Sequence, residues 1–166
     1  DSHRRQRQMC IRDRDELSKF AIKHNIPVTQ TVMGYSTMKR DHSHYAGQIG
    51  GLGGKNTNKL AKETDLAIAV GTKLADFTTG SWANFENENF NLVSINVSRF
   101  DANKHLAQAV IGDAKISLNE LSEALGEWKA EDEWNKKSQT ELKNWNEHID
   151  KAVSYTHLRA HETAVN

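Results

Sequence analysis

The sequence is short of the residues and patterns that mark several classes of protein. Its 166 residues include one cysteine and one proline, and 22 Lys plus Arg balance 22 Asp plus Glu. A single cysteine excludes a disulfide framework or a Cys-based zinc site and fits a reducing, cytoplasmic setting. The neutral balance gives no electrostatic footprint for nucleic acid or an anionic membrane. We expect no membrane span, because no run approaches roughly 20 apolar residues, and no secretory signal, because no charged n-region is followed by an apolar h-region.

The two ends of the chain differ from its middle. Residues 1–12 carry four arginines and the single Cys10, and residues 154–166 continue neither a helical stripe nor a strand alternation. Both segments resemble translated sequencing-adaptor read-through, and the alternative is a pair of native disordered tails. We expect a central α/β domain over 13–128 and a linker helix over 129–153. Residues 13–153 hold 17 basic and 20 acidic residues, a net charge of −3.

Helix and strand patterns alternate along this middle part. Amphipathic spacing predicts helices over 15–24, 113–126 and 130–153, and a polar helix is expected over 56–64. Runs rich in apolar or β-branched residues predict strands over 27–32, 65–71, 91–97 and 108–111. The continuous apolar run within 65–71 is typical of a strand buried on both faces, and a long glycine-punctuated connection fills 34–54. The alternation predicts an α/β fold with an open, mostly parallel sheet flanked by helices.

Two further expectations follow from the order of these elements. The first helix has no predicted strand before it, so we expect the fold to be truncated at its N-terminus, with an unpaired sheet edge. The last helix, with its tryptophan-containing stripe, is predicted to be an exit linker rather than part of the core.

A glycine cluster over 47–56 is the most conspicuous candidate for ligand binding. Its members Gly50, Gly51, Gly53 and Gly54 precede a helix, whose first backbone amides can hold a phosphate. A dinucleotide fingerprint would need a third glycine at Asn56 and a strand directly before the loop, and a P-loop would need Ser or Thr there. Two interpretations stay open: a loop that permits tight turns and close packing, or a ligand contact.

A second candidate follows the strand of 65–71, because open α/β sheets bind ligands at the carboxyl ends of their strands. Its polar residues are Thr72, Lys73, Asp76, Thr78 and Thr79. The alternative is a polar loop that only covers the sheet. No catalytic and no metal-ligating residue is predicted: His42 and His44 lack a third ligand at a recognisable spacing, and Asp113 is interpreted as a helix N-cap.

Three runs together resemble the central domain of thiamine-diphosphate-dependent enzymes. They are the glycine cluster from Gly47, the run Asp65 to Ser81 with the sequence Asp-Leu-Ala-Ile-Ala-Val-Gly-Thr-Lys-Leu-Ala-Asp-Phe-Thr-Thr-Gly-Ser, and Val93 to Val97 with Phe100 to His105. The resemblance covers about residues 13 to 150. Within the family, the segment Asp76 to Trp82 is similar to the trihydroxycyclohexanedione hydrolases of myo-inositol catabolism.

This resemblance implies a Rossmann-like central domain of a three-domain enzyme that cleaves a C–C bond in a cyclic 1,2-diketone. The missing N- and C-terminal domains would be its partners, and they would hold thiamine diphosphate and Mg²⁺ outside this chain. The parent enzyme would be a homo-oligomer. The fragment alone would be inactive. FAD occupies the central domain in the oxidase and synthase branches, so FAD at 71–79 stays an alternative. Two further hypotheses stay open: an acetolactate-synthase-like or pyruvate-oxidase-like central domain, and a stand-alone nucleotide-binding or interaction module.

Overall fold

The computed structural model describes residues 14–162 of the chain, with side chains over 14–154. The predicted tail of 1–12, with Cys10, lies outside the described residues. A first helix covers residues 14–24. It is followed by β1 (Val28–Gln30), β2 (Tyr45–Gln48), α2 (Lys55–Glu63), β3 (Leu66–Val70), α3 (Asp76–Thr79), β4 (Asn91–Asn96), α4 (Arg99–Ala102), the 3₁₀ turn Lys104–Leu106, β5 (Gln108–Ile111), α5 (Ala114–Leu125) and α6 (Asp132–Glu162).

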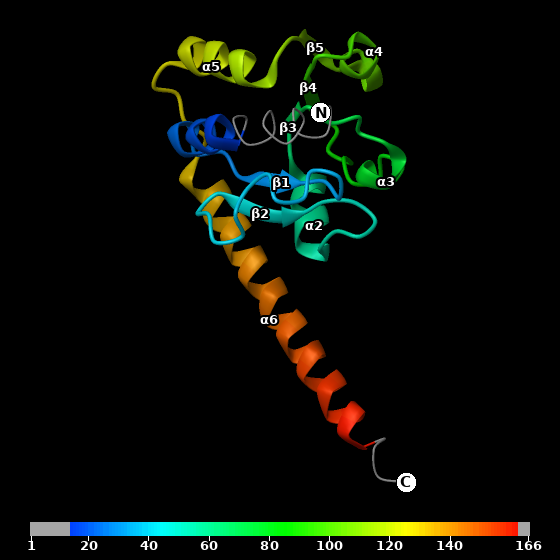
Figure 1. Cartoon of the computed structure of the whole chain (residues 1–166). Helices are drawn as coiled ribbons and strands as arrows, with labels where there is room; N and C mark the ends of the chain where they lie inside the picture. Colours follow the sequence, from blue (N-terminus) through cyan, green and yellow to red (C-terminus); the bar gives the residue numbers. More distant parts are fainter. Residues whose placement is uncertain (1–13, 163–166) are drawn as a thin grey trace, which may run out of the picture.

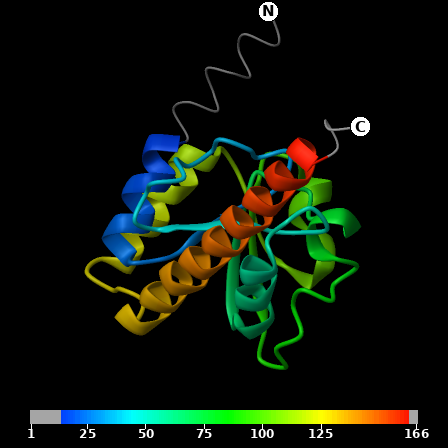
Figure 2. The same ribbon diagram turned by 90° about the horizontal axis from the view of Figure 1, so that it is seen from below.

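The strands form two sheets, and every strand pair in them is parallel. β1 pairs with β2, and a separate sheet has the order β3-β4-β5, with Leu66 opposite Asn91 and Val93 opposite Gln108. Helices flank both sheets (Figures 1 and 2). The predicted α/β class with parallel strands is therefore confirmed, with the strands divided between two sheets.

The strand β2 lies inside the stretch of 34–54 that the sequence predicts to be a connection. It has only four residues, one of them Gly47, and this composition gives neither the alternation nor the apolar run that marks a strand. Tertiary contacts define it instead: Tyr45 and Ala46 are buried, and the Val28 amide donates to the His44 carbonyl.

The strand β3 is less buried than its apolar run predicts. Leu66 is 49% exposed, and in this strand only Ala69 is buried. The expectation of burial on both faces is wrong because β3 is an edge strand, whereas β4 lies between two neighbours. Accordingly the most deeply buried residues of this three-stranded sheet, Ser94 and Ile95, lie in β4.

The first helix packs against both halves of the core. Phe20 belongs to a cluster with Ile95 of β4 and Leu118 of α5, whereas Ala21 belongs to a second cluster with Tyr45 of β2. Leu17 and further partly buried residues pack around these clusters, and Leu17 contacts both. Figure 1 shows the helix, in blue, between α5 and the two-stranded sheet.

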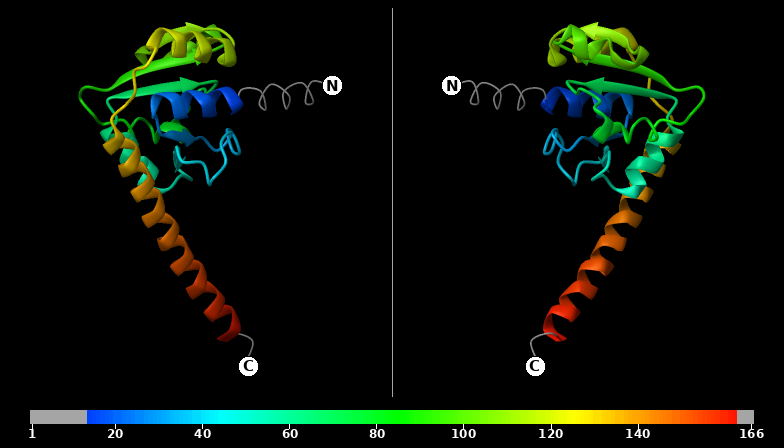
Figure 3. Two further views of the ribbon diagram at one scale, coloured as in Figure 1. Left: turned by 90° about the vertical axis from the view of Figure 1, so that its left-hand side faces the viewer. Right: turned by 90° about the vertical axis from the view of Figure 1, so that its right-hand side faces the viewer.

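The helix α6 begins against the body of the protein and then projects beyond it (Figures 1 and 3). Its first half contacts α2 and β2, and Leu142 is buried in the same cluster as Ala21. The expectation that this helix lies outside the core is therefore wrong for its first half, and its role as a linker stays a prediction. It also continues to Glu162, past the predicted end at 153, because no proline or glycine follows to stop it.

Polar contacts anchor the start of α6. The Ala130 amide donates to the His24 carbonyl, and the fully buried His24 imidazole donates from Nδ1 to the Trp128 carbonyl at 2.7 Å, with Nε2 2.8 Å from Ser122 Oγ. Asn25, in a left-handed conformation with φ 54°, donates to the Asp132 carboxylate. The end of the first helix thus fixes the segment that leads into α6.

Substituting Phe20 by alanine should destabilise the protein by about 3–5 kcal/mol, because a buried aromatic side chain at the centre of a cluster is lost. Urea denaturation followed by circular dichroism measures this loss. Ile22→Ala in the same helix is the matched control, since Ile22 is 56% exposed. Equal losses in the two variants would contradict the central position of Phe20.

The stability of the fold should fall as the pH drops below 6.5. Burial, with a smaller contribution from His42, lowers the pKa of His44 from its usual 6.5. The unfolded chain therefore binds more protons than the folded chain in this range, and stability is present above pH 6.5 and lost below it. Urea denaturation on both sides of pH 6.5 measures the slope. His44→Gln should reduce this slope, and an unchanged slope in that variant would contradict the assignment to His44.

Candidate functional site

The structure brings the two predicted loops together. The Gly51 amide donates to the Phe77 carbonyl at 2.9 Å. A Cβ at Gly50 would lie 2.6 Å from the oxygen of the same carbonyl and 3.0 Å from Thr78 Cα. The Gly50 backbone is therefore close to both residues. The segment after β2 therefore contacts the segment after β3, and the glycines permit the close approach of the two backbones.

The four predicted glycines use their amides within the chain. Gly50 donates to Asn58 Oδ1 at 3.0 Å. Gly53 donates to the Gly50 carbonyl at 2.8 Å and Gly54 to the Gln48 carbonyl at 2.9 Å, in addition to the bond from Gly51 to Phe77. These amides close the loop on itself, and in this arrangement they are not directed at a phosphate.

Asn58 of α2 fixes the loop from the helix side. Its Oδ1 accepts from the Gly50 amide, its Nδ2 donates to the Gly50 carbonyl at 3.1 Å, and Asn84 Nδ2 donates to the same Oδ1 at 3.3 Å. Sequence patterns did not identify Asn58 or Asn84. The only signal for Asn58 is an amide side chain one helical turn after Gly54.

The strand that a dinucleotide fingerprint requires before its glycines is present. None was predicted there, and this expectation is wrong: β2 ends at Gln48, two residues before Gly50, and α2 begins at Lys55. A strand, a glycine-rich loop and a helix therefore do follow one another. The fingerprint still lacks its third glycine, since Asn56 occupies that position and is buried.

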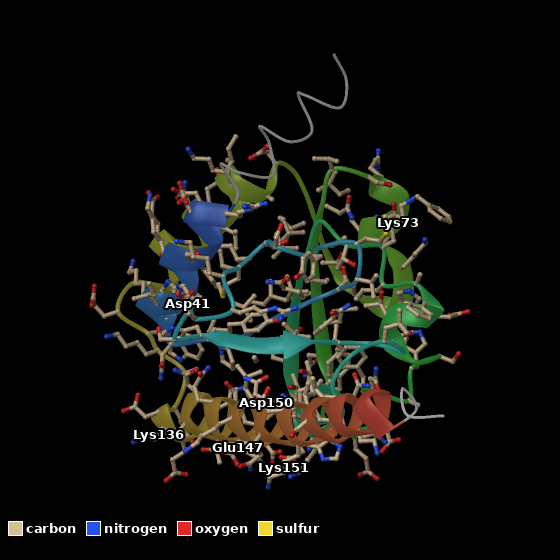
Figure 4. All side chains as sticks on the ribbon, turned by 60° about the horizontal axis from the view of Figure 1, so that its bottom comes forward. Asp41, Lys73, Lys136, Glu147, Asp150 and Lys151 are labelled. Atoms are coloured by element: carbon tan, nitrogen blue, oxygen red, sulfur yellow. The ribbon has the colours of Figure 1, made fainter. Side chains whose placement is uncertain are left out.

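The residues of the second loop lie in different environments. Lys73 and Asp76 are exposed, Asp76 being the first residue of α3, while Thr79 is completely buried. The Thr72 carbonyl accepts from Asn96 Nδ2 at 3.2 Å, which joins the loop to the end of β4. Figure 4 shows Lys73 on the side of the molecule opposite α6.

The segment that follows β4 contains an ion pair between a lysine and an aspartate. Lys104 Nζ lies 2.8 Å from Asp101 Oδ1 and 4.4 Å from the centre of the Phe100 ring. The hydrogen bond from Lys104 lowers the pKa of the Asp101 carboxyl, and the Ser98 hydrogen bond and the charge of Lys73 act in the same direction. The sequence pointed to 100–105 only through the family resemblance, although this segment follows a strand end.

The other polar candidates serve the fold. Asp113 is the N-cap of α5, with its carboxylate accepting from the amides of Lys115 and Ile116, as predicted. The rings of His42 and His44 lie 5.8 Å apart. Among the described residues, no three His, Cys, Asp or Glu side chains gather in a way that could hold a metal ion, and no helix is long and apolar enough to cross a membrane.

Comparison with known proteins assigns the family. The family model described as "Thiamine pyrophosphate enzyme, central domain" matches residues 9–121. The chain belongs to this family. The match covers the sheets, both candidate loops and most of α5, and it ends before α6.

Similar curated proteins are named 3D-(3,5/4)-trihydroxycyclohexane-1,2-dione hydrolase. The protein of Clostridium perfringens is 41% identical over 111 residues, which are 67% of this chain and 17% of that protein. The protein of Clostridium botulinum is 43% identical over 111 residues with the same coverage, and that of Bacillus anthracis is 42% identical over 113 residues, 68% of this chain and 18% of that protein. The aligned part of this thiamine pyrophosphate enzyme domain thus spans about a sixth of these relatives.

Replacing Gly50 by alanine should destabilise the domain more than the same change at Gly71. Both residues have positive φ, 105° and 63°, and such strain costs on the order of 1–2 kcal/mol for a residue with a Cβ. A Cβ at Gly50 also meets the Phe77 carbonyl, whereas one at Gly71 meets no atom within 4 Å. Urea denaturation of both variants measures the difference. Equal losses would show that the contact between the loops contributes little.

Proposed function

We propose that this chain is the central domain of a thiamine-diphosphate-dependent hydrolase that cleaves a C–C bond in a cyclic 1,2-diketone of cytoplasmic inositol catabolism. The observation that supports it best is the 41–43% identity to three relatives named as trihydroxycyclohexanedione hydrolases. The specific segment, Asp76 to Trp82, forms the α3 region that contacts the glycine loop. The residues that mark the hydrolase branch therefore lie at the candidate site.

In this proposal the chain supplies a scaffold. Thiamine diphosphate acts as an electron sink when a C–C bond breaks, and its diphosphate needs Mg²⁺ and carboxylate or amide oxygens. The described residues do not offer a fitting metal-ligand cluster. We therefore assign the cofactor and its Mg²⁺ to N- and C-terminal domains of a longer, homo-oligomeric parent enzyme, and no catalytic residue to this chain.

The glycine loop supports a structural role of the domain over the alternative with FAD. A bound dinucleotide needs free amides or cations around its diphosphate. The amides of Gly50, Gly51, Gly53 and Gly54 are used within the chain, so their arrangement favours close packing of the two loops. Lys73 is the exposed cation of the second loop.

A domain exchange tests the proposal. Residues 9–121 replace the matching segment in the Clostridium perfringens relative, and hydrolysis of the trihydroxycyclohexanedione is measured with and without thiamine diphosphate. We expect activity within roughly tenfold of the parent, equivalent to about 1.4 kcal/mol in the activation barrier, because a scaffold of the same branch presents the same loops to its neighbours.

A matched exchange carries the central domain of an acetolactate synthase into the same enzyme, and it should lose the hydrolase activity. The flavin absorbance of the purified hybrid with residues 9–121 gives a second readout, which should be absent. A folded hybrid without hydrolase activity would contradict the proposal, and stoichiometric flavin would favour the FAD-holding alternative.

A further inference from the structure

Ser122 and His24 form a hydrogen-bonded pair away from the two candidate loops. Ser122 lies on α5 and His24 near the end of the first helix, 98 residues away in sequence. Folding places these two helices side by side (Figure 2), with Phe20 of the first helix against Leu118 of α5. Ser122 Oγ lies 2.8 Å from His24 Nε2. The tertiary structure therefore brings a hydroxyl and an imidazole together that no sequence motif connects.

The Trp128 carbonyl determines which nitrogen of the His24 ring is protonated. His24 Nδ1 lies 2.7 Å from this carbonyl oxygen, and a carbonyl oxygen can only accept a hydrogen bond. Nδ1 therefore holds the ring proton of the neutral imidazole, and Nε2 has a free lone pair. It follows that the Ser122 hydroxyl donates to Nε2. A hydroxyl directed at the unprotonated nitrogen of an oriented histidine is the arrangement that activates a serine nucleophile.

Burial holds the His24 ring in this orientation. The residue is completely buried, and its ring contacts those of Phe20 and Trp128, with centroids 4.8 and 6.4 Å away. Because both nitrogens are hydrogen-bonded and the ring is enclosed, His24 does not need to reorient before it accepts a proton, as a general base requires. The Trp128 carbonyl is thus a positioning group, in the role that a carboxylate has in other serine–histidine sites.

The hydroxyl of the pair lies at the surface of the protein. Ser122 is half-buried, and the exposed Lys23 donates to Ser122 Oγ at 3.2 Å and to the Ser122 carbonyl at 3.3 Å. The Lys23 ammonium group therefore stabilises negative charge that develops on Oγ. The Trp128 side chain is 50% exposed, and it provides apolar surface next to the pair for the organic part of a small molecule.

We propose that Ser122 is a reactive serine that accepts the acyl group of an activated ester. Oγ attacks the carbonyl carbon, and the Oγ–C bond forms while the bond from that carbon to the leaving oxygen breaks. The hydroxyl proton passes to His24 Nε2 and then to the leaving oxygen, so the products are acyl-Ser122 and a free phenol or alcohol. The assignment does not depend on the reaction of the parent enzyme.

Incubation of the full chain with p-nitrophenyl acetate, followed by mass spectrometry of its peptides, tests the proposal. We expect an acetyl group on Ser122 that hydroxylamine removes, as it removes an ester. Ser18 of the first helix is the matched reference, because it is half-buried and has no histidine partner in the described part of the chain. Ser122 should react at least about 100-fold faster than Ser18, as a positioned general base provides, and should lose this advantage when urea unfolds the chain.

Two substitutions separate the roles of the pair. Ser122→Ala should remove the label, and His24→Gln should slow the labelling of Ser122 about 100-fold, with thermal melting to verify that the fold is retained. The proposal is overturned if Ser122 reacts no faster than Ser18, if the unfolded chain reacts at the same rate, if the label is on Lys23 and resists hydroxylamine, or if a folded His24→Gln variant keeps full reactivity. The comparisons with Ser18 and with the unfolded chain use the unmodified sequence, so they decide the proposal even where His24→Gln does not fold.

Discussion

The packing of the first helix between two separate sheets is the contact on which the rest of the molecule depends. Neither sheet has a complete core without it: Phe20 fills the cluster of β4 and α5, while Ala21 lies against β2 and α6. The two residues are adjacent in sequence and lie on different faces of the helix, where a large ring and a methyl group fit different spaces. Burial of a side chain such as Phe20 contributes about 1.5–3 kcal/mol.

The same helix determines where α6 begins. His24 at its end is completely buried and contacts Ser122 and the Trp128 carbonyl, and the His24 carbonyl accepts from Ala130. From this point α6 crosses α2 and β2. The position of α6 against α2 and β2 therefore follows from contacts that the first helix makes.

Local signals predicted those parts of the fold that local chemistry controls. The helix after Asp113 follows from apolar spacing and a capping carboxylate, and the structure confirms it together with the polar helix predicted over 56–64. The strand β2 could not be found this way, because its burial comes from contacts with β1, α2 and α6. The apolar run of β3 suggested full burial, yet its position at a sheet edge, which leaves Leu66 exposed, is a property of the strand order alone.

At the candidate site, local sequence signals likewise predict some residues, while tertiary contacts determine what those residues do. The sequence identifies the glycines, but whether their amides face a ligand or the chain depends on Asn58 and on the Phe77 carbonyl, which come from other elements. Because those acceptors take up the amides, the glycine-rich loop acts as a joint between the ends of β2 and β3.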